Sequence, residues 1–95
     1  MSQTKMLTVF CYDVSGNRNR NRLAKILESY AIRVQKSVFE ARLTAKEAER
    51  ISKLCATELD QGDSLRVYSI DMAGYRRTKT YGSAVILQEQ EFLLV

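Results

Sequence analysis

The feature that most limits the fold of this chain is an apolar run at residues 6–14, MLTVFCYDV. The run is rich in β-branched and aromatic side chains, and polar residues do not alternate with apolar ones along it. A strand of this composition is typical of a position buried on both faces, in the centre of a sheet. The run stops at Asp13, and a turn cluster follows at Ser15, Gly16 and Asn17. We therefore expect a small domain built around this central strand.

Two amphipathic helices are predicted after this strand. The first begins near 17–19, where an Asn side chain can cap it. Its apolar face carries Leu23, Ile26, Leu27 and Tyr30. The second begins at Thr44 and Glu47, which match the S/T-x-x-E capping box, and it runs to about Leu59. Its buried face carries Ala48, Ile51, Cys55 and Leu59.

Strand-like segments separate and follow the helices. The periodicity of residues 32–43 favours one long strand, although a tight hairpin would also fit. Residues 64–70 alternate as a strand, 71–80 have the composition of a polar, basic loop, and 83–87 and 91–95 are short final strands. This order indicates an α+β sandwich, with two helices on one face of a small sheet. With the hairpin it becomes a ferredoxin-like βαββαβ unit.

The residue types that the chain lacks narrow its chemistry. Histidine is absent, which excludes a Ser-His-Asp triad, a Cys-His pair, an HExxH zinc site and a two-histidine ribonuclease mechanism. Cys11 and Cys55 lie in apolar surroundings without C-x-x-C spacing, so we interpret them as core residues in a reducing compartment. No apolar run approaches the roughly 20 residues of a membrane span, and the N-terminus does not resemble a signal peptide. We expect one soluble, cytoplasmic domain over residues 1–95, without membrane contact.

The charge of the chain is basic and uneven. It has 15 Lys and Arg against 11 Asp and Glu, a net charge of +4. The excess is densest at the start of the first helix, at Arg18, Arg20 and Arg22. Guanidinium forks and a helix N-terminus both suit phosphate groups. A second basic segment holds Arg76, Arg77 and Lys79, and there we favour contact with a DNA backbone. The alternative for both segments is a solvated basic surface.

Asp13 is the candidate for carboxylate chemistry because it closes a buried apolar strand. A carboxylate in that position is costly unless it is solvated, paired or bound to a metal. In the alternative interpretation, Asp13 accepts backbone N–H groups in the following turn. Ser37 and Phe39 are interpreted first as a turn residue and a core residue. The residues alone leave these alternatives open.

Four segments, in this order and at these spacings, carry a resemblance to a known family. They are the strand end Tyr12-Asp13-Val14, the Arg- and Asn-rich helix start, residues 33–40 (RVQKSVFE) and the helix start at Leu43-Thr44. Over residues 6–70 the chain resembles the small CRISPR-associated protein of spacer acquisition, the second of the two core adaptation proteins. The resemblance is weaker from Asp71 onward, where the family is variable.

The resemblance implies a ferredoxin-like subunit that forms a symmetric homodimer. It implies that 33–36 and 38–43 are two strands around a turn near Lys36-Ser37, and that 38–43 and 64–70 both lie antiparallel to the first strand. Ser37 and Phe39 would then lie close to Asp13. Among rival carboxylates, Asp63 would lie nearer to Asp13, and Asp71 at the opposite edge. The extension 83–95 would add a strand to the neighbouring subunit.

The resemblance also implies a site. Asp13 matches the family's metal-binding aspartate, and a two-fold axis would supply a second copy to a shared Mg²⁺ or Mn²⁺. Four residues match functional family positions: Arg20, Arg22, Arg33 and Phe39. Arg18 lacks that support. One expectation is a metal-dependent endonuclease acting on RNA or DNA. The alternative is a non-catalytic DNA-binding scaffold that bridges subunits of the integrase, the first core adaptation protein.

Overall fold

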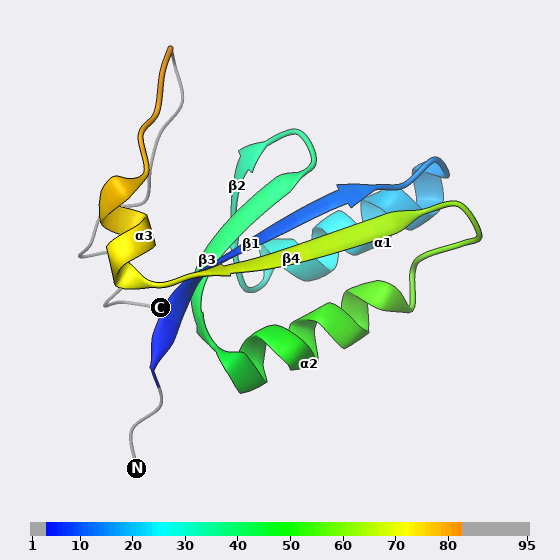
Figure 1. Ribbon diagram of the computed structural model, residues 1–95. Helices are drawn as coiled ribbons and strands as arrows, with labels where there is room; N and C mark the ends of the chain where they lie inside the picture. Colours follow the sequence, from blue (N-terminus) through cyan, green and yellow to red (C-terminus); the bar gives the residue numbers. More distant parts are fainter. Residues whose placement is uncertain (1–3, 83–95) are drawn as a thin grey trace.

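The computed structural model describes residues 4–82. The two short strands predicted in 83–95, and the pairing of that segment with a second copy, lie outside the described residues. The elements are β1 (Lys5–Asp13), α1 (Asn17–Glu28), β2 (Ile32–Gln35), β3 (Val38–Thr44), α2 (Ala45–Ala56), β4 (Ser64–Ile70) and α3 (Met72–Arg77). The first six follow the predicted ferredoxin-like βαββαβ order, so the predicted α+β fold is confirmed (Figure 1).

The sheet has the strand order β2-β3-β1-β4, and all of its neighbours are antiparallel. β1 is central, as its composition predicts, with β3 on one side and β4 on the other. The single long strand favoured by the periodicity of residues 32–43 is wrong, because the chain reverses at Lys36-Ser37 into a hairpin. The backbone N–H of Tyr12 donates to the carbonyl of Ser37 at 3.1 Å, which fixes this turn beside β1.

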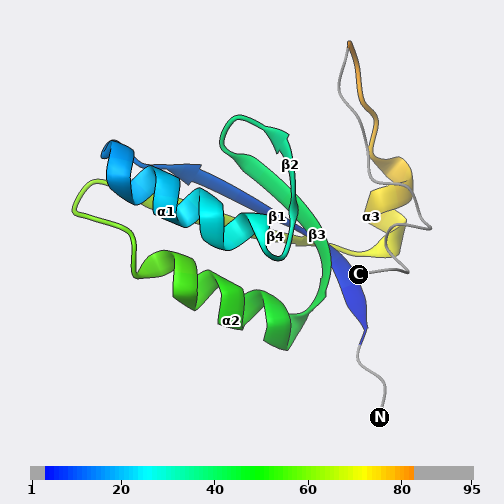
Figure 2. The same cartoon turned by 180° about the vertical axis from the view of Figure 1, so that it is seen from behind.

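Helices α1 and α2 cover the same face of the sheet (Figure 2). Alternate residues of β1, including Phe10 and Tyr12, point to that face and are buried. They pack with Leu23 and Leu27 of α1, and with Ile51 of α2, in one apolar core. Fully burying one such large side chain contributes about 1.5–3 kcal/mol, so this face carries most of the apolar stabilisation.

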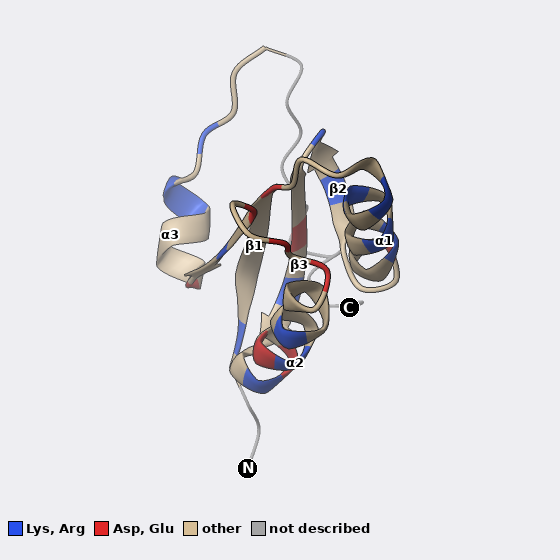
Figure 3. Cartoon of the chain, turned by 90° about the vertical axis from the view of Figure 1, so that its right-hand side faces the viewer, with Lys and Arg blue, Asp and Glu red and all other residues tan. Residues whose placement is uncertain are grey.

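We call the other side of the sheet the open face, and α3 covers only one end of it (Figure 3). Leu7 is buried there against Met72 and Tyr75, whereas Val9 and Cys11 are half-buried and Asp13 is exposed. The prediction that β1 is buried on both faces is therefore wrong for most of the strand. Both long helices lie on one side, and a six-residue helix is too short to cover the other.

Both predicted helix starts are confirmed, at Asn17 and Ala45, but the predicted N-cap is confirmed only for α2. Thr44 Oγ1 accepts from the Glu47 backbone at 3.2 Å, and Glu47 Oε1 accepts from the Thr44 backbone at 2.8 Å, which is the predicted capping box. No Asn caps α1, because Gly16 holds the N-cap position. α1 also ends at Glu28, so Tyr30 lies beyond the helix and is exposed.

The basic loop predicted over 71–80 is wrong for its first half, which forms α3. Asp71 Oδ1 caps this helix by accepting from the Gly74 backbone at 2.8 Å. Met72 and Tyr75 then pack on Leu7. Six residues are too few for a helical period to stand out in the sequence. Within residues 4–82, no helix is long and apolar enough to cross a membrane.

Candidate nucleic-acid and metal-binding site

Asp13 is the last residue of β1 and pairs with Ser64 of β4. The alternation of the strand places it on the open face with Val9 and Cys11, and it is exposed. Within residues 4–82, no hydrogen bond or ion pair engages its carboxylate. The backbone N–H of Tyr12 donates to the carbonyl of Ser37, so Ser37 lies near Asp13 at the same end of the sheet, as expected.

Phe39 is a core residue, which is the first interpretation of it from the sequence. It pairs with Phe10, is fully buried, and faces α1 and α2 rather than the open face. Its ring stacks with that of Tyr12 at a centroid distance of 6.3 Å. Phe39 therefore supports the strand end through the core, on the opposite side of the sheet from the Asp13 carboxylate.

Three of the predicted phosphate-binding arginines are engaged by the fold itself. Arg20 Nη1 donates to the carbonyl of Val14 at 2.9 Å, and its Nη2 donates to the Asn17 side chain. Arg22 Nε lies 2.8 Å from Glu58 Oε1, which links α1 to the turn that follows α2. Along α1, Arg20 therefore bonds to Asn17 and Arg22 to Asn19, each three residues earlier. These hydrogen bonds orient the two guanidinium groups.

Arg33 is the third engaged arginine. Its guanidinium lies 4.8 Å from the Phe39 ring centroid and donates to the carbonyl of Lys36. A longer ion pair of 3.6 Å joins it to Glu28. Arg33 therefore braces the β2–β3 hairpin against the end of α1.

The remaining predicted arginines lie in two separate places. Arg18 is exposed on the first turn of α1, and its guanidinium makes no hydrogen bond or ion pair with the described part of the chain. Arg76 and Arg77 are exposed in the last turn of α3. Helix α3 packs on Leu7, and Leu7 and Asp13 are six residues, or roughly 20 Å, apart along β1, so the two places lie toward opposite ends of this strand. Figure 3 shows in blue that Lys and Arg residues occur along all three helices.

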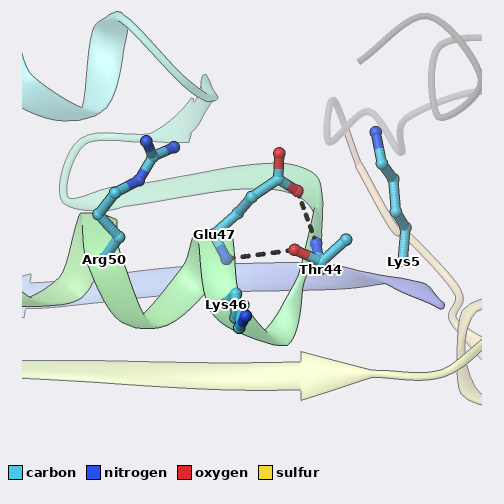
Figure 4. A pocket seen from close by; sticks show the side chains of 5 residues that line it. All are labelled: Lys5, Thr44, Lys46, Glu47 and Arg50. Carbon is cyan, nitrogen blue, oxygen red and sulfur yellow. Dashed lines mark hydrogen bonds between the residues drawn. The ribbon is translucent and has the colours of Figure 1, made fainter. Parts of the chain in front are cut away.

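A further basic groove, missed by the sequence reasoning, opens where β1 begins and α2 starts (Figure 4). Its volume is about 750 Å³, and it is lined by Lys5, Thr44, Lys46, Glu47 and Arg50. The hydrogen bond from the Thr44 backbone holds the pKa of the Glu47 carboxyl below its usual range, and Lys5 and Arg50 act in the same direction. The spacing of Lys46 and Arg50, four residues apart on a predicted helix, could have indicated that the two cations share one face.

Two other carboxylates are related to Asp13 in different ways: Asp63 lies close to the loop after it, and Glu40 shares the open face of the sheet with it. The backbone N–H groups of Asp60 and Ser15 lower the pKa of the Asp63 carboxyl, which hydrogen-bonds to the loop after Asp13. Burial raises the pKa of Glu40, which pairs with Val9 on the open face. The structure, within residues 4–82, brings no three Asp, Glu or Cys side chains together as a metal-binding cluster.

Comparison with known proteins identifies the family. A family model described as "CRISPR associated protein Cas2" matches residues 6–78. The chain belongs to the Cas2 family. A relative named CRISPR-associated endoribonuclease Cas2 3, from Chloroflexus aurantiacus, is 42% identical over 79 residues, covering 82% of this chain and 85% of the relative. The resemblance stated from the sequence is thereby confirmed.

Solved Cas2 structures share the fold. The crystal structure of Streptococcus pyogenes Cas2 at pH 6.5 superposes with a TM-score of 0.69 at 32% identity, covering 81% of this chain and 100% of that one. A chain of a partial Cas6-RT-Cas1–Cas2 complex superposes with a TM-score of 0.60 at 26% identity, covering 79% and 89%. The Cas2 fold therefore extends over most of the described residues.

Proposed function

We propose that this Cas2 protein is a nucleic-acid-binding homodimer of CRISPR spacer acquisition, and that it hydrolyses phosphodiester bonds with a divalent cation held by Asp13. The observation that carries the proposal is the position of Asp13. It is an exposed carboxylate without an intrachain partner in residues 4–82, at the end of the central strand and on the open face. The names of relatives, such as the Chloroflexus endoribonuclease, support nuclease activity.

The open face supports the homodimer. On this face Val9 and Cys11 are half-buried and Tyr68 is 47% exposed. An apolar surface of this kind on a sheet is normally covered by another element or by a partner. A two-fold axis over this face would bury it against its own copy. Such an axis near the end of β1 would also bring the two Asp13 carboxylates together.

The donor set fits a hard cation shared between two subunits. Mg²⁺ takes one or two carboxylates and keeps several waters, and each chain offers one unengaged Asp13 carboxylate. When bound, Mg²⁺ or Mn²⁺ would lower the pKa of a water and neutralise phosphate charge. Asp13 would hold the cation, Arg18 would contact phosphate, and Ser37 would hydrogen-bond water or a phosphate oxygen at the edge of the site.

The partner proposed for the assembly is the Cas1 integrase. The support is the structural similarity to a chain of a complex whose name includes Cas1 and Cas2. The nucleic acid would contact the exposed Arg18 of α1 and the exposed Arg76 and Arg77 of α3, which lie on opposite sides of the sheet.

The test compares wild-type protein with Asp13→Asn and with Glu49→Gln as a charge-matched control. Glu49 is exposed on α2, and within residues 4–82 its only ion pair is the one with Lys53. Each protein is incubated with labelled RNA or duplex DNA, in Mg²⁺, in Mn²⁺ or in EDTA. We expect metal-dependent cleavage by wild type and Glu49→Gln, and none by Asp13→Asn. Equal cleavage by Asp13→Asn, or cleavage in EDTA, would refute the role of Asp13.

A second candidate function is a non-catalytic DNA-binding scaffold, and the spread of the basic residues favours it. Arg18 follows the Asp13 end of β1, whereas Arg76 lies on α3 beside the Leu7 end, and basic residues at both ends of the strand suit several separate backbone contacts rather than one compact site. The scaffold would bind duplex DNA through phosphates without reading bases. Retained duplex binding without cleavage by any variant would favour it over the nuclease.

The salt dependence of binding tests the proposed contacts under both functions. Each lost phosphate contact should lower the slope of log K against log salt by about 1. We expect this for Arg18→Ala and twice this for Arg76→Ala combined with Arg77→Ala. Unchanged slopes would show that the phosphates bind elsewhere, and the groove lined by Lys46 and Arg50 would then be the next candidate.

A further inference from the structure

Two side chains from other parts of the chain hold the backbone that follows Asp13. From α1, Arg20 Nη1 donates to the carbonyl oxygens of Val14 at 2.9 Å and Ser15 at 3.4 Å. From the loop before β4, Asp63 Oδ1 accepts from the Ser15 backbone N–H at 3.2 Å and from Ser15 Oγ at 3.3 Å. Ser15 is therefore bonded through its N–H, its carbonyl and its side chain.

Hydrogen bonds within its own turn also hold Asp63 in place. Its Oδ2 accepts from the Asp60 backbone at 2.9 Å, and its own N–H donates to the Asp60 carbonyl at 3.0 Å. The turn between them needs Gly62, whose φ of +90° is favourable only for glycine. Asn19 Nδ2 donates to Asp60 Oδ2 at 3.0 Å, which ties this turn to α1.

We propose that Asp63 is a positioning residue for Asp13, and that Asp63 and Arg20 together clamp the Val14–Ser15 segment. Asp13 and Ser64 are the last residue pair between β1 and β4. Beyond them, the hydrogen bond from Ser15 to Asp63 is the contact that holds the two chain segments together. Without the clamp, the end of β1 would fray and the Asp13 carboxylate would lose its fixed place. This inference rests on the proposed nuclease function.

The contacts of Asp63 distinguish this role from metal binding. Both of its carboxylate oxygens accept backbone N–H groups, Oδ1 from Ser15 and Oδ2 from Asp60. A cation would compete with those donors for the same oxygens. Asp63 therefore acts on Asp13 through the backbone, and the cation is left to Asp13 itself.

The test compares Asp63→Ala and Asp63→Asn with wild type, and Glu49→Ala serves as a charge-matched control on α2. Misplacing a reacting group by about 1 Å can cost up to 10²-fold in rate. We expect Asp63→Ala to lower kcat for metal-dependent cleavage about tenfold, with KM for the nucleic acid unchanged. Asp63→Asn keeps one oxygen that can accept from Ser15 but loses the acceptor for the Asp60 N–H, so it should recover part of kcat. The Mg²⁺ concentration for half-maximal rate should stay the same in both.

Two kinetic results would overturn the proposal. Cleavage by Asp63→Ala at the wild-type rate would show that Asp13 needs no clamp. If Asp63→Asn were as slow as Asp63→Ala, and both needed several-fold more Mg²⁺, Asp63 would be a metal ligand instead.

A readout independent of catalysis separates this proposal from the proposed function. Amide hydrogen exchange at Ser15 should become about tenfold faster in Asp63→Ala than in wild type or Glu49→Ala, since a lost hydrogen bond of this kind is worth about that factor. If wild type cleaves no nucleic acid, the nuclease proposal fails, and Ser15 exchange then decides the clamp alone. Unchanged exchange in Asp63→Ala would refute it.

Discussion

Replacing Arg33 with alanine tests whether this arginine serves the fold or the ligand. The sequence places Arg33 among the candidate nucleic-acid contacts, whereas the structure engages its guanidinium three times within the chain. It lies over the Phe39 ring at 4.8 Å, donates to the Lys36 carbonyl, and pairs with Glu28 at 3.6 Å. We therefore expect Arg33→Ala to destabilise the protein even without nucleic acid.

The magnitude follows from the three contacts. The Arg33 side chain is 42% exposed, so each contribution is taken at the low end of its range. A cation–π contact at an exposed site contributes about 0.5 kcal/mol, and a charged hydrogen bond about 1.5 kcal/mol. The ion pair with Glu28, itself 58% exposed, adds little because solvent screens it. The sum is about 2 kcal/mol, or a fall in Tm of about 10 °C for a domain of this size.

The assay is thermal and urea unfolding at one protein concentration, because a dimer makes Tm depend on concentration. Arg18→Ala is the matched control, since it removes the same exposed charge without a described partner, and it should shift the free energy of unfolding by less than about 0.5 kcal/mol. A double-mutant cycle with Phe39→Leu isolates the ring contact. If Arg33→Ala were as stable as Arg18→Ala but bound nucleic acid more weakly, Arg33 would be a ligand contact and the reasoning would be wrong.

Three further predictions concern the helices and the thiols. Thr44→Ala removes the capping box and should lower the free energy of unfolding by about 1 kcal/mol in urea, whereas Thr44→Ser should restore it. Because the folded-state pKa of Glu47 is lowered, its carboxylate stabilises the fold above the unfolded-state pKa, and this stability is lost as the pH falls through the folded-state pKa. Glu47→Gln keeps a capping side chain and should flatten the acid limb of a Tm-against-pH curve; an unchanged limb would contradict this. Burial raises the pKa of the Cys55 thiol to about 11, so a thiol reagent should label the half-buried Cys11 first, and equal labelling of both by mass spectrometry would show that Cys55 is accessible.

Local patterns in the sequence were sufficient to predict much of the fold. The apolar run of β1, the alternation of β4 and the Thr44–Glu47 capping box all depend on residues close together in the chain, and all are confirmed. The hairpin at Lys36-Ser37 needed the family resemblance, because β2 and β3 have one continuous strand-like composition. Helix α3 was missed because its six residues hold less than two turns.

The candidate site was predictable only in part, because its contacts join distant residues. The place of Asp13 at the end of β1 follows from the apolar run, and its face follows from the alternation of the strand. The engagement of Arg22 depends on Glu58, which lies 36 residues away in the sequence. The contact between Ser15 and Asp63 spans 48 residues. A charge pattern shows neither pairing, so basic residues that brace the fold and basic residues open to a ligand look alike in the sequence.

The central place of β1 in the sheet has a consequence for synthesis. Strand β1 leaves the ribosome before its partner β4, whose residues follow it by 51 to 63 positions in the register from Asp13–Ser64 to Leu7–Ile70. At about 5–20 residues per second, that interval lasts roughly 3 to 13 s. Throughout it, one edge of an apolar strand stays unpaired, which is the form of exposed edge that favours aggregation. The nascent chain therefore depends most on chaperones before residue 70 is made, and truncations that end earlier should accumulate as insoluble protein.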